Sequence, residues 1–368
     1  MTQIIGPFPP IPILLAAYPA TLFLGTSMRI LISANSFPPA VGGYERVALL
    51  VARQLVERGH FVKVVTLTAD AEENAFPFEV YRRPSIFRLL KLLWWSDVYV
   101  QNNVSLKFLW PLLFCWRPLV CVHHGFYTDA ESFSASWRAR LKLLVTRLAS
   151  NICVSRAVAD TIPGKSFVAL NPYEDGIFFR IPDIIKTKEL IFVGRMVSDK
   201  GMDVLIEACA ELWKRGINPS LTMAGSGPEE PAIRRRIHEL GLQGSVAFAG
   251  GVKAEELRRL LNAHKIMVVP TREWEGFGVV ALEGIACGCV VVGSTCGGIP
   301  EAIGACGQTF SSGNWAELAG ILEDLLAHEE KWDRFFVHAK AHLDAHRPAV
   351  VVDRYLKVLT NVLASRRN

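Results

Sequence analysis

Short apolar runs alternate with amphipathic helical segments along most of this chain, and this alternation is the feature that most constrains its fold. The run MRILISA, residues 28–34, is apolar enough for a strand buried on both faces. The loop NSFPPAVGG follows, and YERVALLVARQLVERGH then repeats its apolar residues with helical spacing until Gly59 ends the segment. Strands that alternate with helices in this way predict an α/β fold with a parallel sheet.

The alternation occurs in two series, and 368 residues are too many for one ordinary core. The first series continues through FVKVVTLT, DVYVQNN, LVCVHHG and NICVS, and the second runs from ELIFVGRM through SLTMAGSG, VAFAG and IMVVPT to CVVVGS. We predict two facing Rossmann-like, doubly wound domains with a central cleft. The predicted domains are residues 28–172 and 189–340, joined by a linker at 173–188, with a helical segment at 341–368 that crosses back to the first domain.

Residues 1–27 carry no charge, and prolines interrupt them repeatedly. The segment lacks the basic start of a signal peptide and is too rich in proline for a good membrane-spanning helix. We expect a disordered extension or a misassigned start ahead of Met28, with a weak membrane contact as the alternative.

Positive charge is concentrated in residues 28–172, which hold 17 Lys and Arg against 10 Asp and Glu, whereas the rest of the chain is slightly acidic. A basic half favours an anionic partner, such as nucleic acid, a phospholipid surface or a phosphorylated acceptor, over a solvated face without a partner. The segments YRRPSIFRLLKLLWW and SASWRARLKLLVTR place cations beside Leu and Trp. They fit helices that lie on an anionic membrane, or core helices whose Arg and Lys reach out to solvent.

Eight cysteines occur without any C-x-x-C pair or His/Cys spacing typical of zinc. Most lie in apolar runs such as LVCVHH and GIACGCVVV. We therefore expect buried free thiols in a reducing compartment, which is the cytoplasm.

The loops after strands are where ligands of such sheets bind. In VGRMVSDKG, Arg195 and Lys200 lie between a strand and a helix start, where two cations and free N–H groups suit a diphosphate. An ordinary charged surface loop is the alternative. The strand ending in VHHGFY carries His123 and His124, and adjacent strand residues point to opposite faces, so at most one faces the cleft.

Two glutamates, Glu275 and Glu283, lie in the otherwise apolar stretch TREWEGFGVVALEGIACGCVVV. A buried carboxylate is costly without a partner, so each is expected to accept hydrogen bonds from a hydroxyl-rich ligand. The N–H groups of Phe277, Gly278 and Val279 would point outward at the start of a helix. Metals also suit paired carboxylates, but no third acid or histidine is near in the sequence. Gly-Gly turns in VGGYER and CGGIPEAIG permit close backbone contact with an anion.

Taken in order, these loops resemble the retaining glycosyltransferases of family 4, which have the GT-B fold. The family's two glutamates separated by seven residues are matched by Glu275 and Glu283, and its G-R-x-x-x-x-K-G loop by residues 194–201. The pattern F-P-P-x-x-G-G-x-E is matched at residues 37–45, and G-G-I-P-E at 297–301. The similarity covers the chain from Met28 to its end. Two departures are small, because Gly284 and Cys289 replace the usual alanine and proline without removing a functional group.

The resemblance implies a role for each matched residue. Arg195 and Lys200 would stabilise the donor's diphosphate as leaving group in place of a metal, and Glu283 would bind the ribose. Glu275 would hold a hydroxyl of the donor sugar, and His124, with His123 as the alternative, would lie near that sugar. The expected catalytic residues are Arg195, Lys200, Glu275 and His124, and the expected substrate-binding residues are Gly42, Gly43, Gly194, Gly276, Phe277, Gly278, Val279, Glu283, Gly297 and Gly298.

The resemblance implies a metal-independent hexosyltransferase that needs no cofactor and moves a sugar from a nucleotide diphosphate sugar, with UDP or GDP, to a glycan or lipid-linked acceptor. Cell-surface polysaccharide or glycolipid synthesis, in the cytoplasm or on the inner face of the membrane, fits this reaction, and nucleic acid is not an expected partner. The alternatives are a nucleotide-sugar epimerase of the same fold and a non-catalytic, membrane-associated binding module. Intact Arg195, Lys200, Glu275 and Glu283 argue against the binding module.

Overall fold

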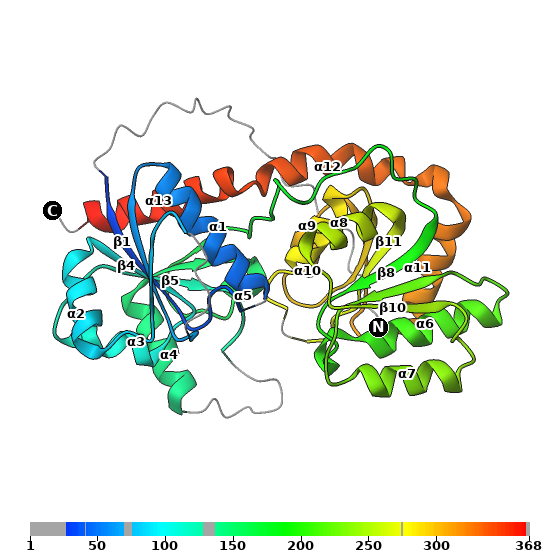
Figure 1. Ribbon diagram of the computed structural model, residues 1–368, viewed down its shortest axis with the longest axis horizontal. Helices are drawn as coiled ribbons and strands as arrows, with labels where there is room; N and C mark the ends of the chain where they lie inside the picture. Colours follow the sequence, from blue (N-terminus) through cyan, green and yellow to red (C-terminus); the bar gives the residue numbers. More distant parts are fainter. Residues whose placement is uncertain (1–26, 41, 70–75, 128–136, 274, 366–368) are drawn as a thin grey trace, which may run out of the picture.

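The structure is a computed structural model that describes residues 27–40, 42–69, 76–127, 137–273 and 275–365. The expectation for residues 1–26 lies outside this described part of the chain. Two parallel sheets stand side by side, each with helices on both faces (Figure 1). The α/β class with two doubly wound units, predicted from the alternating pattern, is confirmed.

The first sheet has seven strands in the order β3-β2-β1-β4-β5-β6-β7. Strand β1 pairs on both sides, with Ile32 opposite Val64 of β2 and Val100 of β4. The strands are β1 (Arg29–Ala34), β2 (Phe61–Thr66), β3 (Glu79–Arg82), β4 (Val98–Asn102), β5 (Leu119–His123), β6 (Ser150–Cys153) and β7 (Ser166–Val168).

The first sheet is covered differently on its two faces. On one face α1 (Gly43–Glu57) and α13 (Pro348–Ala364) pack together over residues such as Ile30 and Val64. On the other face α2 (Ile86–Trp95), α3 (Leu106–Leu109) and the 3-10 helix η1 (Trp110–Leu113) cover Leu31, Val65 and Tyr99. Further along that same face α4 (Trp137–Leu148) packs against β6, and α5 (Arg156–Ala159) follows β6.

The second sheet has six strands in the order β10-β9-β8-β11-β12-β13. The strands are β8 (Lys188–Val193), β9 (Leu221–Ala224), β10 (Val246–Gly250), β11 (His264–Val269), β12 (Val290–Ser294) and β13 (Gly307–Phe310). One face is covered by α6 (Met202–Lys214), α7 (Glu230–Glu239) and α11 (Trp315–Ala327). The opposite face is covered by α8 (Ala254–Ala263), α9 (Val279–Ala286) and α10 (Ile299–Ile303).

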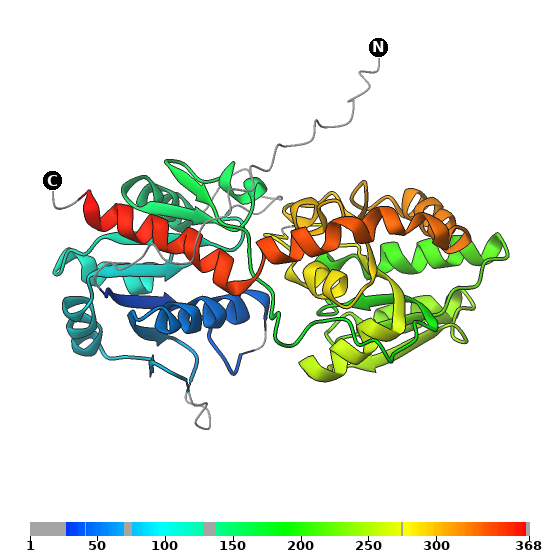
Figure 2. The same cartoon turned by 90° about the horizontal axis from the view of Figure 1, so that it is seen from above.

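The chain crosses between the two sheets twice. It first crosses between β7 and β8, and it returns through α12 (Asp333–Ala345) and α13, which run along the top of the molecule (Figures 1 and 2). The bend between these helices is fixed by His346, whose ring Nδ1 lies 2.8 Å from the Asn171 carbonyl oxygen. The His346 carbonyl in turn accepts the N–H of Tyr173 at 3.3 Å. The exact domain boundaries stay predictions.

The cysteines and the apolar helices can be compared with what the sequence predicts. All eight cysteines are free, and only Cys296 among them is not fully buried. Within the described ranges, no helix is long and apolar enough to cross a bilayer.

Candidate active site

A cation and a carboxylate from two loops of the second domain meet at the carboxyl edge of its sheet. The Lys200 ammonium Nζ donates a hydrogen bond to Glu275 Oε2 at 2.7 Å. Lys200 lies in the 3-10 turn η2 (Ser198–Lys200) after β8, and Glu275 lies between β11 and α9, so the pairing of β8 with β11 brings the loops together. Burial lowers the pKa of Lys200, but the Glu275 and Asp199 carboxylates together leave this pKa raised, so the ammonium stays charged.

Backbone contacts shape the loop that carries Arg195 and Lys200. The N–H of Gly194 donates to the Ala224 carbonyl at 3.0 Å. The loop that follows β8 is therefore held by the end of β9. Gly201 has a φ of 65°, and a Cβ there would lie 2.0 Å from the Pro270 carbonyl oxygen, so only glycine fits. Arg195 is exposed at the rim.

The start of α9 presents free donors beside Glu275. Gly278, with a φ of 87°, is the residue before the helix, which begins at Val279. Within the described residues, the N–H groups of Phe277 and Gly278 donate no hydrogen bond, as expected for the first turn of a helix. Phe277 itself is buried, so its backbone rather than its ring is available to a ligand.

Three glycines allow this loop to pack tightly against its neighbours. A Cβ on Gly276 would lie 2.0 Å from the carbonyl oxygen of His124, in the other domain. Gly297 and Gly298 pack against the backbone of Glu275 and Gly276, and the Gly298 N–H donates to the Glu275 carbonyl at 3.0 Å. These two glycines thus support the glutamate loop, and the Gly298 N–H is already engaged within the protein.

Glu283 is buried, as its apolar surroundings predict, and it lies on α9 facing the first domain. Its Oε1 lies 3.9 Å from Nη1 of Arg46 on α1, and the same nitrogen is 3.3 Å from Oε2 of Glu174. Burial raises the pKa of Glu283 to about 7, although the Arg46 charge opposes the rise and Glu174 adds to it. Glu283 is therefore poised between its protonated and ionised forms near neutral pH.

The two histidines at the end of β5 have different surroundings. His123 is fully buried, and its ring nitrogens lie 2.9 Å from the Tyr127 hydroxyl and from Asn151 Oδ1, so both are occupied within the fold. His124 uses Nε2 toward Asn102 Oδ1 at 2.9 Å, while its buried Nδ1 has no partner among the described residues. Burial and the neighbouring His123 lower the pKa of His124 to about 3, so its imidazole is neutral. Of the pair, His124 is the one with a ring nitrogen left for a ligand.

The Gly-Gly turn of the first domain differs from the expectation of an open anion site. Gly42 precedes α1, and a Cβ there would lie 2.2 Å from the Glu45 carboxylate, which folds back over the helix start. A carboxylate at this position repels a phosphate and favours hydroxyl groups. Gly43 faces open space.

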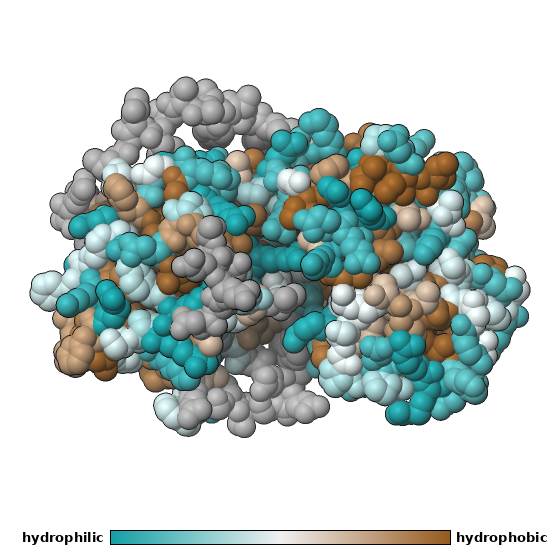
Figure 3. Space-filling view, in the orientation of Figure 1, coloured by the Kyte–Doolittle hydropathy of each residue, from teal (hydrophilic) through white to brown (hydrophobic). Residues whose placement is uncertain are grey.

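The domains are also joined by a contact that the sequence did not predict. The N–H of Arg156, at the start of α5, donates to Oε1 of Glu301 on α10 at 2.8 Å. The recess between the two halves is lined by hydrophilic residues (Figure 3). Arg46, Glu174 and Glu301 were missed as site residues; Arg46 directly follows the VGGYE motif and Glu301 ends GGIPE, which are the signals that point to them.

No group of three or more His, Cys, Asp or Glu side chains in the described ranges is arranged to hold a metal ion. The charged groups of the site are Lys200, Glu275 and Glu283 of the second domain, with Arg195 exposed beside them, and Glu45 and Arg46 of the first domain. The protein thus has two α/β domains, with Lys200, Glu275 and Glu283 on one side of the cleft and a neutral histidine and the charged start of α1 on the other.

Comparison with known proteins identifies this class. Residues 41–165 match the model of Glycosyltransferase Family 4, and residues 177–342 match that of glycosyl transferases group 1. The chain belongs to the family 4, group 1 glycosyltransferases and is therefore a glycosyltransferase with the GT-B fold.

Relatives and solved structures of similar length support this assignment. An uncharacterized glycosyltransferase of Methanocaldococcus jannaschii is 27% identical over 324 residues, 75% of this chain and 83% of that protein. A GDP-mannose-dependent alpha-(1-6)-phosphatidylinositol monomannoside mannosyltransferase of Mycobacterium tuberculosis is 27% identical over 320 residues, 75% of this chain and 82% of the relative. HepE of Anabaena, solved with UDP and glucose, has the same fold, with a TM-score of 0.76 at 20% identity over 90% of this chain and 99% of HepE.

Proposed function

We propose that the protein transfers a sugar, with retention at the anomeric carbon, from a nucleotide diphosphate sugar to a glycan or lipid-linked acceptor. The observation that carries the proposal is the Lys200–Glu275 pair, which lies beside the free N–H groups of Phe277 and Gly278. A cation and free amide donors suit a diphosphate, and a carboxylate suits a sugar hydroxyl. His124 faces the same loop from the other domain.

In this proposal the bond between the anomeric carbon and the diphosphate oxygen breaks, and its electron pair leaves with the diphosphate. Lys200 and Arg195 stabilise the negative charge that develops there, which is electrostatic stabilisation of the transition state. The acceptor hydroxyl oxygen forms the new bond to the anomeric carbon, and its proton passes to the departing diphosphate. Closure of the two domains excludes water and favours transfer over hydrolysis.

The remaining residues orient the donor. Glu275 accepts a hydrogen bond from a sugar hydroxyl, and Glu283 accepts those of the ribose. His124 contributes its Nδ1 as a neutral hydrogen-bonding group, because its low pKa prevents it from acting as a cation. Gly42, beside the Glu45 carboxylate, and its neighbour Gly43 belong to the acceptor side of the cleft rather than to a phosphate site.

A lipid-linked acceptor is favoured by the names of the relatives. The mycobacterial relatives are named for a phosphatidylinositol monomannoside, and a relative from Schizosaccharomyces pombe, 23% identical over 354 residues, is named as a phosphatidylinositol N-acetylglucosaminyltransferase subunit. The basic first domain suits such an acceptor, and a peripheral position on the inner face of the membrane follows from it.

The donor is tested by thermal shift of the purified protein with UDP- and GDP-sugars, followed by measurement of donor hydrolysis. Stabilisation by one nucleotide series, lost in Glu283→Ala, is the expected result. Turnover that persists in EDTA is expected if the protein's own cations replace a metal. A protein that no nucleotide sugar stabilises contradicts the proposal, and a product that is an epimerised donor without an acceptor supports the epimerase instead.

A further inference from the structure

Large apolar side chains are exposed in unusual number on one face of the first domain. This face is formed by α2, η1 and α4. Right-handed crossovers in this strand order place all three on the same side of the seven-stranded sheet. Figure 3 shows hydrophobic residues at the left end of the molecule, where Figure 1 places α2. We call this surface the apolar face; its exposed members are Ile86, Phe87, Trp94, Leu113, Phe114, Trp116, Trp137, Leu141, Leu144 and Leu148.

The α4 part of the apolar face is a continuous stripe. Trp137, Leu141, Leu144 and Leu148 recur with helical spacing and are all exposed, with Leu148 at 76%. The buried anchor of the helix is elsewhere, at Thr146, whose hydroxyl donates to the Pro163 carbonyl. The helix thus packs on the sheet through one side and presents a second apolar side to its surroundings.

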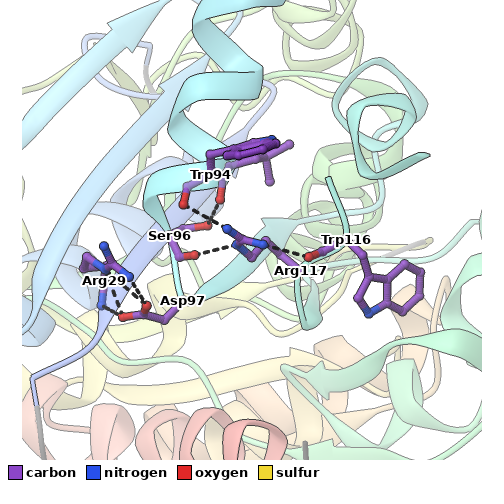
Figure 4. A network of polar contacts seen from close by, with 7 residues as sticks. Arg29, Trp94, Ser96, Asp97, Trp116 and Arg117 are labelled. Carbon is purple, nitrogen blue, oxygen red and sulfur yellow. Dashed lines mark hydrogen bonds and ion pairs between the residues drawn. The ribbon is translucent and has the colours of Figure 1, made fainter. Parts of the chain in front are cut away.

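The α2–η1 part is held in place by Arg117. Its guanidinium donates hydrogen bonds to the backbone carbonyls of Trp94, Ser96 and Trp116 (Figure 4). These bonds tie the end of α2 to the segment after η1 through the backbone, while Trp94 and Trp116 stay 67% and 62% exposed. The tryptophans are therefore fixed at the surface rather than left on free loops.

The charged residues that the structure describes on α2, α3 and α4 are all basic. Between Arg83 and Leu148, the described residues include one acidic residue, Asp97, and it is held by Arg29 at the edge of the sheet. The exposed cations Lys91 and Lys107 on α2 and α3 form no ion pair within the described ranges, and the same holds for Arg140 and Arg147 on α4. Unpaired cations beside exposed Trp, Phe and Leu match the chemistry of a bilayer surface that carries anionic headgroups.

We propose that the apolar face docks on an anionic lipid bilayer, with its Trp, Phe and Leu side chains in the interface and its cations on the headgroups. The proposal rests on the proposed function in one respect, which is that the docked face supplies a lipid-linked acceptor to the cleft. Because α4 connects parallel strands β5 and β6, its first turn lies at the carboxyl edge of the sheet, the edge that also holds His124. A bilayer on this face therefore lies beside the mouth of the cleft.

The test is flotation of the full-length protein with vesicles of phosphatidylglycerol and phosphatidylcholine, compared with pure phosphatidylcholine vesicles, at low and high salt. We expect binding to the anionic vesicles that salt weakens, and at least about a tenfold loss of binding in Leu144→Ser/Leu148→Ser and in Phe114→Ser/Trp116→Ser. The matched control, Phe61→Ser/Val337→Ser, removes equally exposed apolar side chains outside the face and should bind as the wild type does. Arg140→Gln/Arg147→Gln should weaken binding, whereas Lys214→Gln/Arg235→Gln on the second domain should not.

Protein that stays at the bottom of the gradient with anionic vesicles overturns the proposal, as does equal loss of binding in the control. A concentration-dependent dimer that Leu144→Ser/Leu148→Ser abolishes, without flotation, also overturns it and assigns the face to a second copy. Nucleotide-sugar binding is measured on the same samples. Intact binding without flotation removes only the docking proposal, and flotation without any nucleotide binding removes only the proposed function.

Discussion

The two domains share one architecture but differ in what surrounds their surface cations. On the second domain several exposed cations form ion pairs, as Arg215 does with Glu211 and Glu323, and Arg236 with Glu207 and Glu239. On the outer helices of the first domain, cations such as Lys91 and Arg147 have no carboxylate partner in the described part of the chain, and they lie among exposed Trp, Phe and Leu side chains. The combination of unpaired cations with exposed apolar side chains is what distinguishes the first domain.

The two domains also contribute different groups to the cleft. The second domain contributes Lys200, Glu275 and the start of α9, which together suit a charged donor. The first domain contributes a neutral histidine together with the Glu45 carboxylate and the Arg46 cation of α1. We infer that the second domain holds the donor and the first meets the acceptor, and the following experiments test that division.

The largest effect is expected for Lys200→Ala, which removes a cation from the donor side. Turnover should fall by about 100- to 1,000-fold, because an electrostatic contact to the departing diphosphate is lost. The rate of transfer or donor hydrolysis measures this loss, and Lys214→Ala, an exposed lysine on the same domain, is the control. If Lys200→Ala and Arg195→Ala both keep normal turnover, the leaving-group role of these cations is wrong.

Gly276→Ala tests the contact between the two sides. A Cβ at this position would overlap the His124 carbonyl oxygen, so the domains must separate by a small distance. We expect kcat to fall by about tenfold, because small displacements in a site lose catalytic geometry, while the nucleotide Kd changes little. Gly320→Ala, where a Cβ meets nothing within 4 Å, is the matched control. Full turnover in Gly276→Ala would show that the close approach is not needed.

The raised pKa of Glu283 makes both stability and nucleotide affinity depend on pH. Its pKa of about 7 lies above its ordinary 4.5, so the folded protein binds more protons than the unfolded chain between these values. This contribution to stability is present at low pH and is lost as the pH rises through about 7. Nucleotide affinity should change in the opposite sense and rise with pH, because the ionised carboxylate accepts both ribose hydroxyls.

The neighbours of Glu283 should move this midpoint in opposite directions. Arg46→Ala removes the cation that lowers the Glu283 pKa and shifts the midpoint to higher pH, and Glu174→Gln removes the anion that raises it and shifts the midpoint down. Calorimetric titration with nucleotide from pH 5.5 to about 8.5 measures both. The profile should become flat in Glu283→Gln, and an unchanged slope there assigns the titration to another group.

The smallest effect is expected on stability. Leu113→Ser and Val337→Ser each replace an exposed apolar side chain, one on each domain, and should change the free energy of unfolding by less than about 0.5 kcal/mol. Chemical denaturation measures the difference. A clearly destabilised Leu113→Ser would mean that this residue supports the fold, and the apolar face would then lose a member.

Much of the fold and of the glutamate loop could be predicted, because both depend on patterns within short stretches of sequence. The alternating apolar runs predicted the parallel sheets. The sequence around the two glutamates predicted that Glu275 lies in a loop and Glu283 on the helix that follows it. Short elements such as β3, β7 and β13 were missed, since three or four residues carry too little periodicity. Contacts between domains were also missed. The Arg46–Glu283 pair joins residues that are far apart in sequence, and no local pattern states which faces will meet.

Gly298 shows a different limit of sequence reasoning. A Gly-Gly turn at the end of a strand suggests a ligand contact, but here the glycine makes room for the backbone of the neighbouring loop. The residue type reports that something approaches closely, and only the structure says whether it is a ligand or the protein itself.

The return of α13 to the first sheet has a consequence for synthesis of the chain. The apolar residues of α13 complete the same core as β1 and α1, which are translated about 300 residues earlier; these residues are Val351, Val352, Tyr355, Leu356 and Leu359. Part of the first domain's core, on the side of α1, therefore stays uncovered while the whole second domain is translated and folds. A ribosome that stalls before α13 releases a chain whose first core is partly uncovered. Chaperones and proteases bind apolar surfaces of this kind. Closure of the first core therefore has to wait until α13 has been translated.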